Sequence, residues 1–537
     1  MRRLPPPPHT QVMNVIFDNY QDASGVNFAT ALNAIAKKAR KASPQDRRKV
    51  VGGPAFRDVV GGAAKSAAGM KPRDLANSLW ALGSLRYVAD KSVARLAAAA
   101  TARADELNTR DLSTALWALG SMRHKDPAFL RAAEARLAAD FDAASDQDLV
   151  MALAALGQHG AGPGPLLTRC LDRLAATDEA DVASWGSPAY LGVLARAVSR
   201  SGAYRGPFWL RIETALLGGA LPPREAANVF GAMAAARHQP PRAVVQAALD
   251  LVAPAGDVVA GDRDARQAHP MDVAQCVHAA AVLRGGVAER SDGPLALEGA
   301  VRAAMKGMGP RELALCAWAL AVTGPRAHGE TLQRLTDALG RARALRDDSL
   351  RQVMQVLLLC EGAGAPLEAD PGLEQAAAQA WMAAAAASGD RLGSVTRGVA
   401  GILERLGANC RAKVRTMDGM LVVEVGVRGG EGELAALEVL HRRSCAANTG
   451  AILGSDWARA QLLRSQGWGV EHIASSDWHS REHAGKVALV AMLLEKQGMG
   501  ADPAVVEEVA AGDAEAPDEP SVTDDESEGE PVAEALA

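Results

Sequence analysis

Residues 107–122 read LNTRDLSTALWALGSM, and residues 70–85 read MKPRDLANSLWALGSL, a near copy that lies 37 residues upstream. A more divergent third copy, SDQDLVMALAALGQHG, occupies residues 145–160, another 37 residues on. In these three copies we call the apolar residue after the acidic one the anchor. Aligning the weaker copies on the same phrase gives the full series of anchors: Phe28, Leu75, Leu112, Leu149, Leu191, Ala226, Val273, Leu313 and Leu350. Spacings run from 35 to 47 residues, and a period of this size is typical of a helical solenoid.

Each copy reads as the first of two helices. Leu75, Leu79 and Leu82 fall at i, i+4 and i+7, so they share one face of a helix. Pro72 suits the first helical turn, and Asp74 suits the positive end of the helix dipole. The segment after each copy, such as PAFLRAAEARLAADFDA at 127–143, has an apolar stripe of its own. One helix pair cannot bury two stripes, so we predict a stacked array of helix pairs, an α-solenoid over residues 21–387.

Charge is unevenly distributed along the chain. The 537 residues are 48% hydrophobic and 4% aromatic, with a formal net charge of −5. Residues 502–537 contain thirteen Asp or Glu and no Lys or Arg, which leaves +8 on residues 1–501. A mildly basic body suits an anionic partner. We predict that residues 499–537 form a disordered acidic tail, because their composition cannot build a core.

Other features narrow the class of protein. The six cysteines are scattered without a CxxC pair, and we interpret them as reduced core thiols. The sequence contains no apolar run of about 20 residues, so we predict no membrane span. It also contains no P-loop, HExxH or GxSxG motif, so we expect neither a cofactor nor a metal. Residues 1–20 begin MRRLPPPPHT, which fits either a disordered start or an organelle-targeting segment whose helix the prolines interrupt.

Two columns of the repeat vary while its frame is kept. Two residues after the anchor, the helix face beside the leucine stripe carries polar candidates for hydrogen bonds to RNA bases, namely Asn77, Thr114, Asn228, Gln275 and Gln352. Two residues before the anchor stand cations that are candidates for phosphate contacts, namely Arg73, Arg110, Arg224 and Arg311. An ordinary solvated helix face explains both columns equally well. A third column, which holds Trp80, Trp117 and Trp318, fits packing between helices better than base stacking.

The phrase RDLxxxLWALGSL, at a period of about 37–38 residues, resembles the octotricopeptide repeats and the related repeats of FAST-kinase-like proteins. The resemblance is most specific over residues 71–160. It implies an α-solenoid that binds single-stranded RNA in mitochondria or chloroplasts, with other organellar RNA-processing proteins as further partners and no membrane.

Residues 388–498 read as a small α/β domain. GMLVVEVGV (419–427) is the best strand pattern, ELAALEVLHRRS follows as a second strand, and DWARAQLLRSQGW (456–468) reads as a helix. GVEHIASSDW (469–478) is a predicted strand and turn, and EHAGKVALVAMLLEKQG (482–498) a closing helix. LEVLH, RAQLLRSQGW and HIASSDW resemble the RAP domain of organellar repeat proteins, with its core at 434–496. That resemblance implies a fold like that of restriction-type endonucleases.

The RAP resemblance also implies which residues stand where a nuclease holds its metal. Glu424 matches the first acid and Glu438 the second, but Leu440 stands in place of the third and Arg459 in place of the usual lysine. Two carboxylates without the third ligand make a poor Mg²⁺ site. We therefore expect no catalysis, and we interpret a basic group as a second set of phosphate-contact candidates: His441, Arg442, Arg443 and Arg459.

Three functions remain open on the sequence alone. Our hypothesis is sequence-selective binding of single-stranded RNA in an organelle, supporting RNA processing, stability or translation without a cofactor. The first alternative is a protein-interaction scaffold, which the low aromatic content also fits. The second is a weak metal-dependent endoribonuclease that uses the RAP-like domain.

Overall fold

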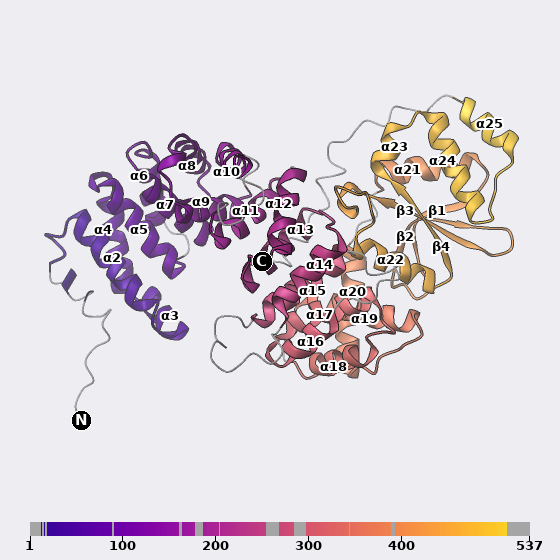
Figure 1. The fold of residues 1–537 in the computed structure, drawn as a ribbon, viewed down its shortest axis with the longest axis horizontal. Helices are drawn as coiled ribbons and strands as arrows, with labels where there is room; N and C mark the ends of the chain where they lie inside the picture. Colours follow the sequence, from indigo (N-terminus) through magenta and orange to yellow (C-terminus); the bar gives the residue numbers. More distant parts are fainter. Residues whose placement is uncertain are drawn as a thin grey trace. The chain divides into compact units, whose positions relative to one another are not determined.

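The computed structural model describes residues 12, 15–16, 19–87, 91–160, 164–177, 186–202, 204–253, 268–283, 297–342, 344–387 and 392–512 (Figure 1). The first eleven residues and the acidic residues 513–537, for which we predicted targeting or disorder, lie outside the described residues. The chain divides into two compact units, Met1–Ala215 and Leu216–Ala537, each of which is described by itself.

The first unit is built from helix pairs. The first helices of the pairs pack side by side in chain order, and they are α2 (Gly25–Ala39), α5 (Pro72–Leu85), α7 (Thr109–Ser121), α9 (Asp146–Gln158) and α11 (Pro188–Arg200). The second helices follow them in the chain as α4 (Pro54–Lys65), α6 (Lys91–Thr101), α8 (Pro127–Ala139), α10 (Pro165–Ala175) and α12 (Gly206–Leu217), and α3 (Pro44–Gly52) stands between α2 and α4. The predicted helical repeat is therefore present, with each anchor leucine in the interface between helices.

Local sequence explains where α7 and α9 begin, whereas packing determines how the chain turns after the first helices. Asn108 caps α7 by accepting a hydrogen bond from the Asp111 amide, and Ser145 with Asp148 forms a capping box on α9. Eleven residues after the anchor, the chain turns through a left-handed residue, with φ 53° at Arg86 and 54° at Arg123. An arginine in this conformation costs about 1–2 kcal/mol, and three-dimensional packing of the repeat maintains it.

Gly83 and Gly120 lie in the last turn of α5 and α7, close to the helix ends as we expected. A Cβ atom built on Gly83 would lie 2.7 Å from the Ala118 Cα atom of α7. No side chain fits in that space, so Gly83 allows the backbones of α5 and α7 to approach closely. In the LWALG phrase of α5, the glycine is therefore needed for helix packing.

The second unit continues the helix pairs. Its first helices are α13 (Pro223–Ala235), α15 (Pro270–Leu283), α17 (Pro310–Thr323) and α19 (Asp347–Gly362). Its second helices are α14 (Arg242–Val252), α16 (Leu297–Ala304), α18 (Gly329–Gly340) and α20 (Pro371–Ala387). Each first helix again packs against the next, so the repeat geometry continues through the weakly matching copies.

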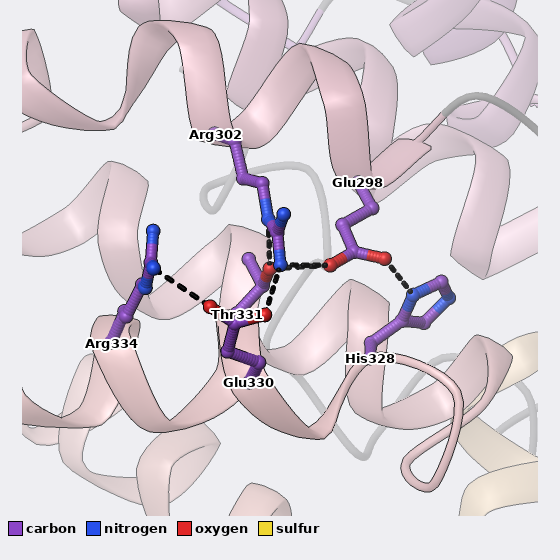
Figure 2. A network of polar contacts seen from close by, with 6 residues as sticks. All are labelled: Glu298, Arg302, His328, Glu330, Thr331 and Arg334. Atoms are coloured by element: carbon purple, nitrogen blue, oxygen red, sulfur yellow. Dashed lines mark hydrogen bonds and ion pairs between the residues drawn. The ribbon is translucent and has the colours of Figure 1, made fainter.

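A polar network joins α16 to the start of α18 (Figure 2). Arg302 Nη2 lies 3.0 Å from Glu298 Oε1 and 2.9 Å from Glu330 Oε2, and the Thr331 hydroxyl donates to Glu298 Oε1 at 2.5 Å. His328 Nδ1 lies 3.1 Å from Glu298 Oε2. The Thr331 hydroxyl, together with His328 and Arg302, lowers the pKa of Glu298 below its ordinary value. These contacts link two second helices of adjacent repeats through charged and polar side chains.

A small α/β domain follows the repeats within the second unit. Its elements are α21 (Ser394–Arg405), β1 (Asn409–Arg415), β2 (Val422–Arg428), β3 (Leu434–Leu440), α22 (Gly454–Ser465), β4 (Trp468–Ala474), α23 (Ser475–Ser480), α24 (His483–Lys496) and α25 (Pro503–Ala511). The sheet order is β1-β2-β3-β4; β1 and β3 run antiparallel to β2, while β4 runs parallel to β3. The predicted helices and strands of this block are present, with β1 and α23 in addition.

The apolar core of this domain lies between the sheet and α21 and α24. Val425 and Val427 of β2 belong to one buried cluster there with Val399 of α21 and Val490 of α24, and α22 lies against the opposite face of the sheet (Figure 1). Helix α25 adds Val505 and neighbouring apolar residues to the core cluster. Our prediction of disorder from residue 499 onward is therefore wrong for residues 503–511.

The α/β domain is docked on the repeats of its own unit. Asn448 and Gln239 exchange hydrogen bonds of 3.0 and 2.8 Å at the end of α13, and the Arg237 guanidinium donates to the Arg442 carbonyl oxygen. Helix α22 packs against α15 and α19, and the Trp381 indole of α20 donates to the Met420 carbonyl oxygen at 2.5 Å. None of the described helices combines the length and the apolar character needed to cross a membrane.

Candidate functional site

Helices α5 and α7 present matching stripes on the side of each helix away from its buried leucines. Along α5 the exposed Arg73 is followed at i+4 and i+7 by the half-buried Asn77 and Trp80. The equivalent positions of α7 are Arg110, Thr114 and Trp117, with the same degrees of exposure. Since α5 and α7 are packed side by side, the two stripes lie on neighbouring helices and form one surface, which we call the α5–α7 face.

The side chains of the α5–α7 face are available for a ligand. Within the part of the chain that the structure describes, no side-chain hydrogen bond engages Asn77 or Thr114, and no ion pair engages Arg73 or Arg110. Burial raises the pKa of Asp111 above its ordinary value, although Arg73 and Arg110 act in the opposite direction. Both guanidinium groups are therefore close enough to this carboxyl group to interact with it electrostatically.

One further cation lies at this face, and it was not among the predicted contacts. The Arg40 guanidinium, just beyond the end of α2, lies 5.9 Å from the centre of the Trp80 ring, a cation–π distance. The basic run AKKARKA at 36–42 indicates cations here, but the sequence alone does not show which of them lies beside α5. Arg40 extends the positive side of the α5–α7 face to a third helix.

The same columns are less available in the second unit. Asn228 donates to Glu225 Oε2 at 3.0 Å, and Gln275 donates to the Ala227 carbonyl oxygen at 3.0 Å. Gln352 is half-buried, Arg224 is exposed and Arg311 is half-buried. The predicted base-contact column is thus partly used for packing between helices here.

The tryptophan column supports the packing interpretation at one position. Trp318 is buried, its indole donates to Gln355 Oε1 at 2.6 Å, and its ring centre lies 5.1 Å from that of His278. These three residues occupy the same column of consecutive repeats. Burial, and secondarily Arg311, lowers the pKa of His278 to about 4, so the ring is neutral at pH 7.

The two predicted acids lie where β2 and β3 separate. The last paired residues are Val425 and Leu437, and beyond them Glu438 Oε1 accepts a hydrogen bond of 2.9 Å from the Glu424 amide. Arg459 of α22 donates to Glu438 Oε2 at 2.7 Å and to the Val422 carbonyl oxygen. The Glu438–Arg459 pair therefore takes over backbone hydrogen bonding that the sheet no longer provides.

Each carboxylate already has a cationic partner. Lys413 Nζ lies 2.8 Å from Glu424 Oε1, and the Thr396 hydroxyl donates to Glu424 Oε2 at 3.0 Å. Burial acts to lower the pKa of Arg459, but Glu438, with Glu424 further away, outweighs it and raises the pKa above its ordinary value. Among the described residues, no group of three or more His, Cys, Asp or Glu side chains is placed to hold a metal ion.

The four residues of the predicted basic patch of the α/β domain differ in exposure and in their partners. Arg442 and Arg443 are exposed in a single 3-10 turn, and His441 before them is half-buried. Arg459 donates hydrogen bonds to Glu438 and to the Val422 carbonyl oxygen, and its predicted contact with phosphate stays a prediction. Lys413 was missed because its strand has no apolar run that marks it in the sequence.

All six cysteines are free thiols, and four are buried in the repeats. Burial raises the pKa of Cys170 to about 11 and that of Cys360 to about 12, so neither is a thiolate at pH 7. The prediction of core thiols holds for these residues.

No known protein-family model matches the sequence, and no curated protein matches it either.

Proposed function

We propose that this protein binds single-stranded RNA through the α5–α7 face, in a sequence-selective way and without catalysis. The observation that supports this most is the repetition of Arg73–Asn77–Trp80 as Arg110–Thr114–Trp117 on the next helix. Guanidinium groups hold phosphates, short polar side chains hydrogen-bond base edges, and half-buried indoles offer a surface for stacking.

The repetition also fits the geometry of an RNA strand. Neighbouring helices in such arrays are about 8–10 Å apart, and a side chain on each helix contacts one nucleotide or a small group of nucleotides. One cation, one polar residue and one aromatic residue per helix are the groups that a nucleotide engages. The resemblance to octotricopeptide repeats, and of residues 388–498 to a RAP domain, implies the same function in a mitochondrion or chloroplast.

In this proposal the endonuclease-like fold that the RAP resemblance implies is retained for contacts and not for cleavage. Glu424 and Glu438 are neutralised by Lys413 and Arg459, so a divalent metal ion would have to displace both cations. The bound RNA is then protected from nucleases, or it is kept unstructured so that other organellar RNA-processing proteins can reach it. No cofactor takes part.

The test compares two double variants of the full chain. Arg73→Ala with Arg110→Ala removes the cations of the α5–α7 face, and Arg95→Ala with Arg131→Ala removes two exposed arginines of the second helices α6 and α8. We expect the first variant to bind random single-stranded RNA at least tenfold more weakly and the second to bind as the wild type does. Equal losses of affinity in both variants would indicate that RNA binds only by nonspecific electrostatic attraction. If the wild type binds no RNA, the protein-scaffold alternative is favoured.

Base selectivity needs a separate comparison. Asn77→Ala with Thr114→Ala is expected to change which sequences are retained from a random RNA pool while total affinity changes little. An unchanged sequence profile would show that these side chains do not read bases.

A further inference from the structure

The α/β domain contains a cavity of about 490 Å³, lined by none of the residues predicted as sites. A row of paired residues crosses all four strands beside it, in which Asn409 pairs with Arg428, Arg428 with Leu434, and Leu434 with Trp468. Side chains of directly paired residues lie on the same face of a sheet. The cavity is completed by the β1–β2 hairpin and by Gln466 at the end of α22.

Three exposed arginines line this cavity: Arg411, Arg415 and Arg428. Across the described ranges, no hydrogen bond or ion pair engages their guanidinium groups. The lining also contains Asp418, but its carboxylate accepts hydrogen bonds from the Thr416 hydroxyl at 2.5 Å and from Gln466 Nε2 at 2.6 Å. Three unpaired cations against one internally bonded carboxylate make the cavity attractive to an anion.

Part of the remaining lining is apolar, and the absence of a side chain at Gly426 shapes it. Val414, Leu434 and Trp468 contribute apolar surface. A Cβ atom on Gly426 would lie 3.2 Å from both the Trp468 ring and Val414, so the glycine leaves space for these groups on this side of β2. Met417 at the hairpin is fully exposed beside the cavity.

We propose that this cavity binds a nucleotide, with its phosphate on the arginines and its base against the apolar lining. A fork of guanidinium N–H groups matches a terminal phosphate, which carries more charge and more free oxygen atoms than a phosphodiester. A flat base with a hydrogen-bonding edge fits the apolar surface beside Asn409 and Gln466. The volume is within the range of small-ligand pockets, about 300–1,000 Å³.

The nucleotide has two possible sources, a free nucleotide or the phosphorylated end of an RNA strand. The second source rests on the proposed function, and it assigns the α/β domain to the end of the RNA while the repeats hold its interior. The first source does not depend on RNA binding.

The experiment uses the full chain and four probes: adenosine monophosphate, and a short single-stranded RNA with a phosphate at its 5′ end, at its 3′ end or at neither. Arg428→Glu reverses one cavity charge at an exposed position. Arg397→Glu is the matched control, an exposed arginine of α21, which packs on the opposite face of the sheet. Calorimetric titration gives the affinity for each probe.

We expect one end-phosphorylated RNA to bind at least tenfold more tightly than the unphosphorylated RNA, and this preference to be lost in Arg428→Glu and retained in Arg397→Glu. Binding of adenosine monophosphate that Arg428→Glu alone abolishes supports the cavity even if no RNA binds, in which case only the proposed function fails. The inference is overturned if end phosphates and adenosine monophosphate have no effect on the wild type, or if both variants behave alike.

Discussion

Replacing Gly83 by alanine tests the repeat packing most sharply. Alanine is a better helix former than glycine by about 1 kcal/mol, so an unobstructed Gly→Ala change stabilises a helix. At Gly83, however, the new Cβ would lie 2.7 Å from the Ala118 Cα and 3.0 Å from its carbonyl oxygen. These are backbone atoms, and relieving such an overlap costs about 3 kcal/mol, the upper part of the range for overpacking. The net expectation is a loss of about 2 kcal/mol.

Two other glycines of the same unit serve as controls. A Cβ on Gly61, inside α4, meets no atom within 4 Å, so Gly61→Ala is expected to gain about 1 kcal/mol. A Cβ on Gly120 first meets the flexible end of Gln158 at 2.7 Å, so Gly120→Ala should be close to neutral. For a unit of this size 1 kcal/mol corresponds to about 2–4 °C in Tm. Thermal unfolding followed by circular dichroism should therefore rank Gly61→Ala above Gly120→Ala, and Gly120→Ala above Gly83→Ala, which lies about 5 °C below wild type. A Gly83→Ala protein as stable as Gly61→Ala would refute the close approach of α5 and α7.

Three further predictions concern the second unit. Because the folded-state pKa of His278 is about 4 against 6.5 for a free side chain, the unfolded chain binds the proton first, and stability is lost as pH falls from 6.5 towards 4. At pH 5 this amounts to about 2 kcal/mol, and His278→Phe should remove that loss when urea unfolding at pH 7 and pH 5 is compared. Glu438→Gln leaves the Arg459 charge without its partner and should cost about 2 kcal/mol, whereas Glu424→Gln, which is more exposed, should cost less than about 1 kcal/mol in the same assay. Millimolar Mg²⁺ should leave the Tm unchanged, since both carboxylates already have cationic partners; a rise that Glu424→Gln abolishes would reveal a metal site.

The strongest repeat signal allowed the first unit to be predicted from sequence. Leucines at i, i+4 and i+7, and the spacing of 37 residues between the three strongest copies, specify both the helices and their stacking. The left-handed arginines were not predictable, because Arg86 and Arg123 adopt a conformation that their side chains disfavour and that only the packed turn imposes. The role of Gly83 likewise depends on the distance to a second helix.

The α/β domain was less predictable where local composition conflicts with tertiary packing. Strand β1, NCRAKVR, has no apolar run and one polar face, because Asn409 and Arg411 face the cavity instead of the core. Helix α25 lies in a strongly acidic tail, yet Val505 and Val509 add locally to the core cluster. The cavity itself combines side chains from four strands, and only their register brings Arg428 close to Trp468.

The candidate RNA contacts were predicted as columns, and the structure separates the columns by availability. Asn77 and Thr114 are unengaged within the described residues, whereas Gln275 reaches into the space above Gly231 and donates to the preceding helix. Sequence position relative to the anchor is identical in both cases. The difference arises from the size of the residue on the neighbouring helix, which periodicity does not report.

The salt dependence of RNA binding tests the central claim most directly. The affinity of the full chain for random single-stranded RNA should fall steeply with salt, and the slope of log K against log salt should be smaller by about 1.4 in the Arg73→Ala, Arg110→Ala variant, which lacks two phosphate contacts. A slope that is the same in wild type and variant would contradict the assignment of phosphate contacts to the α5–α7 face.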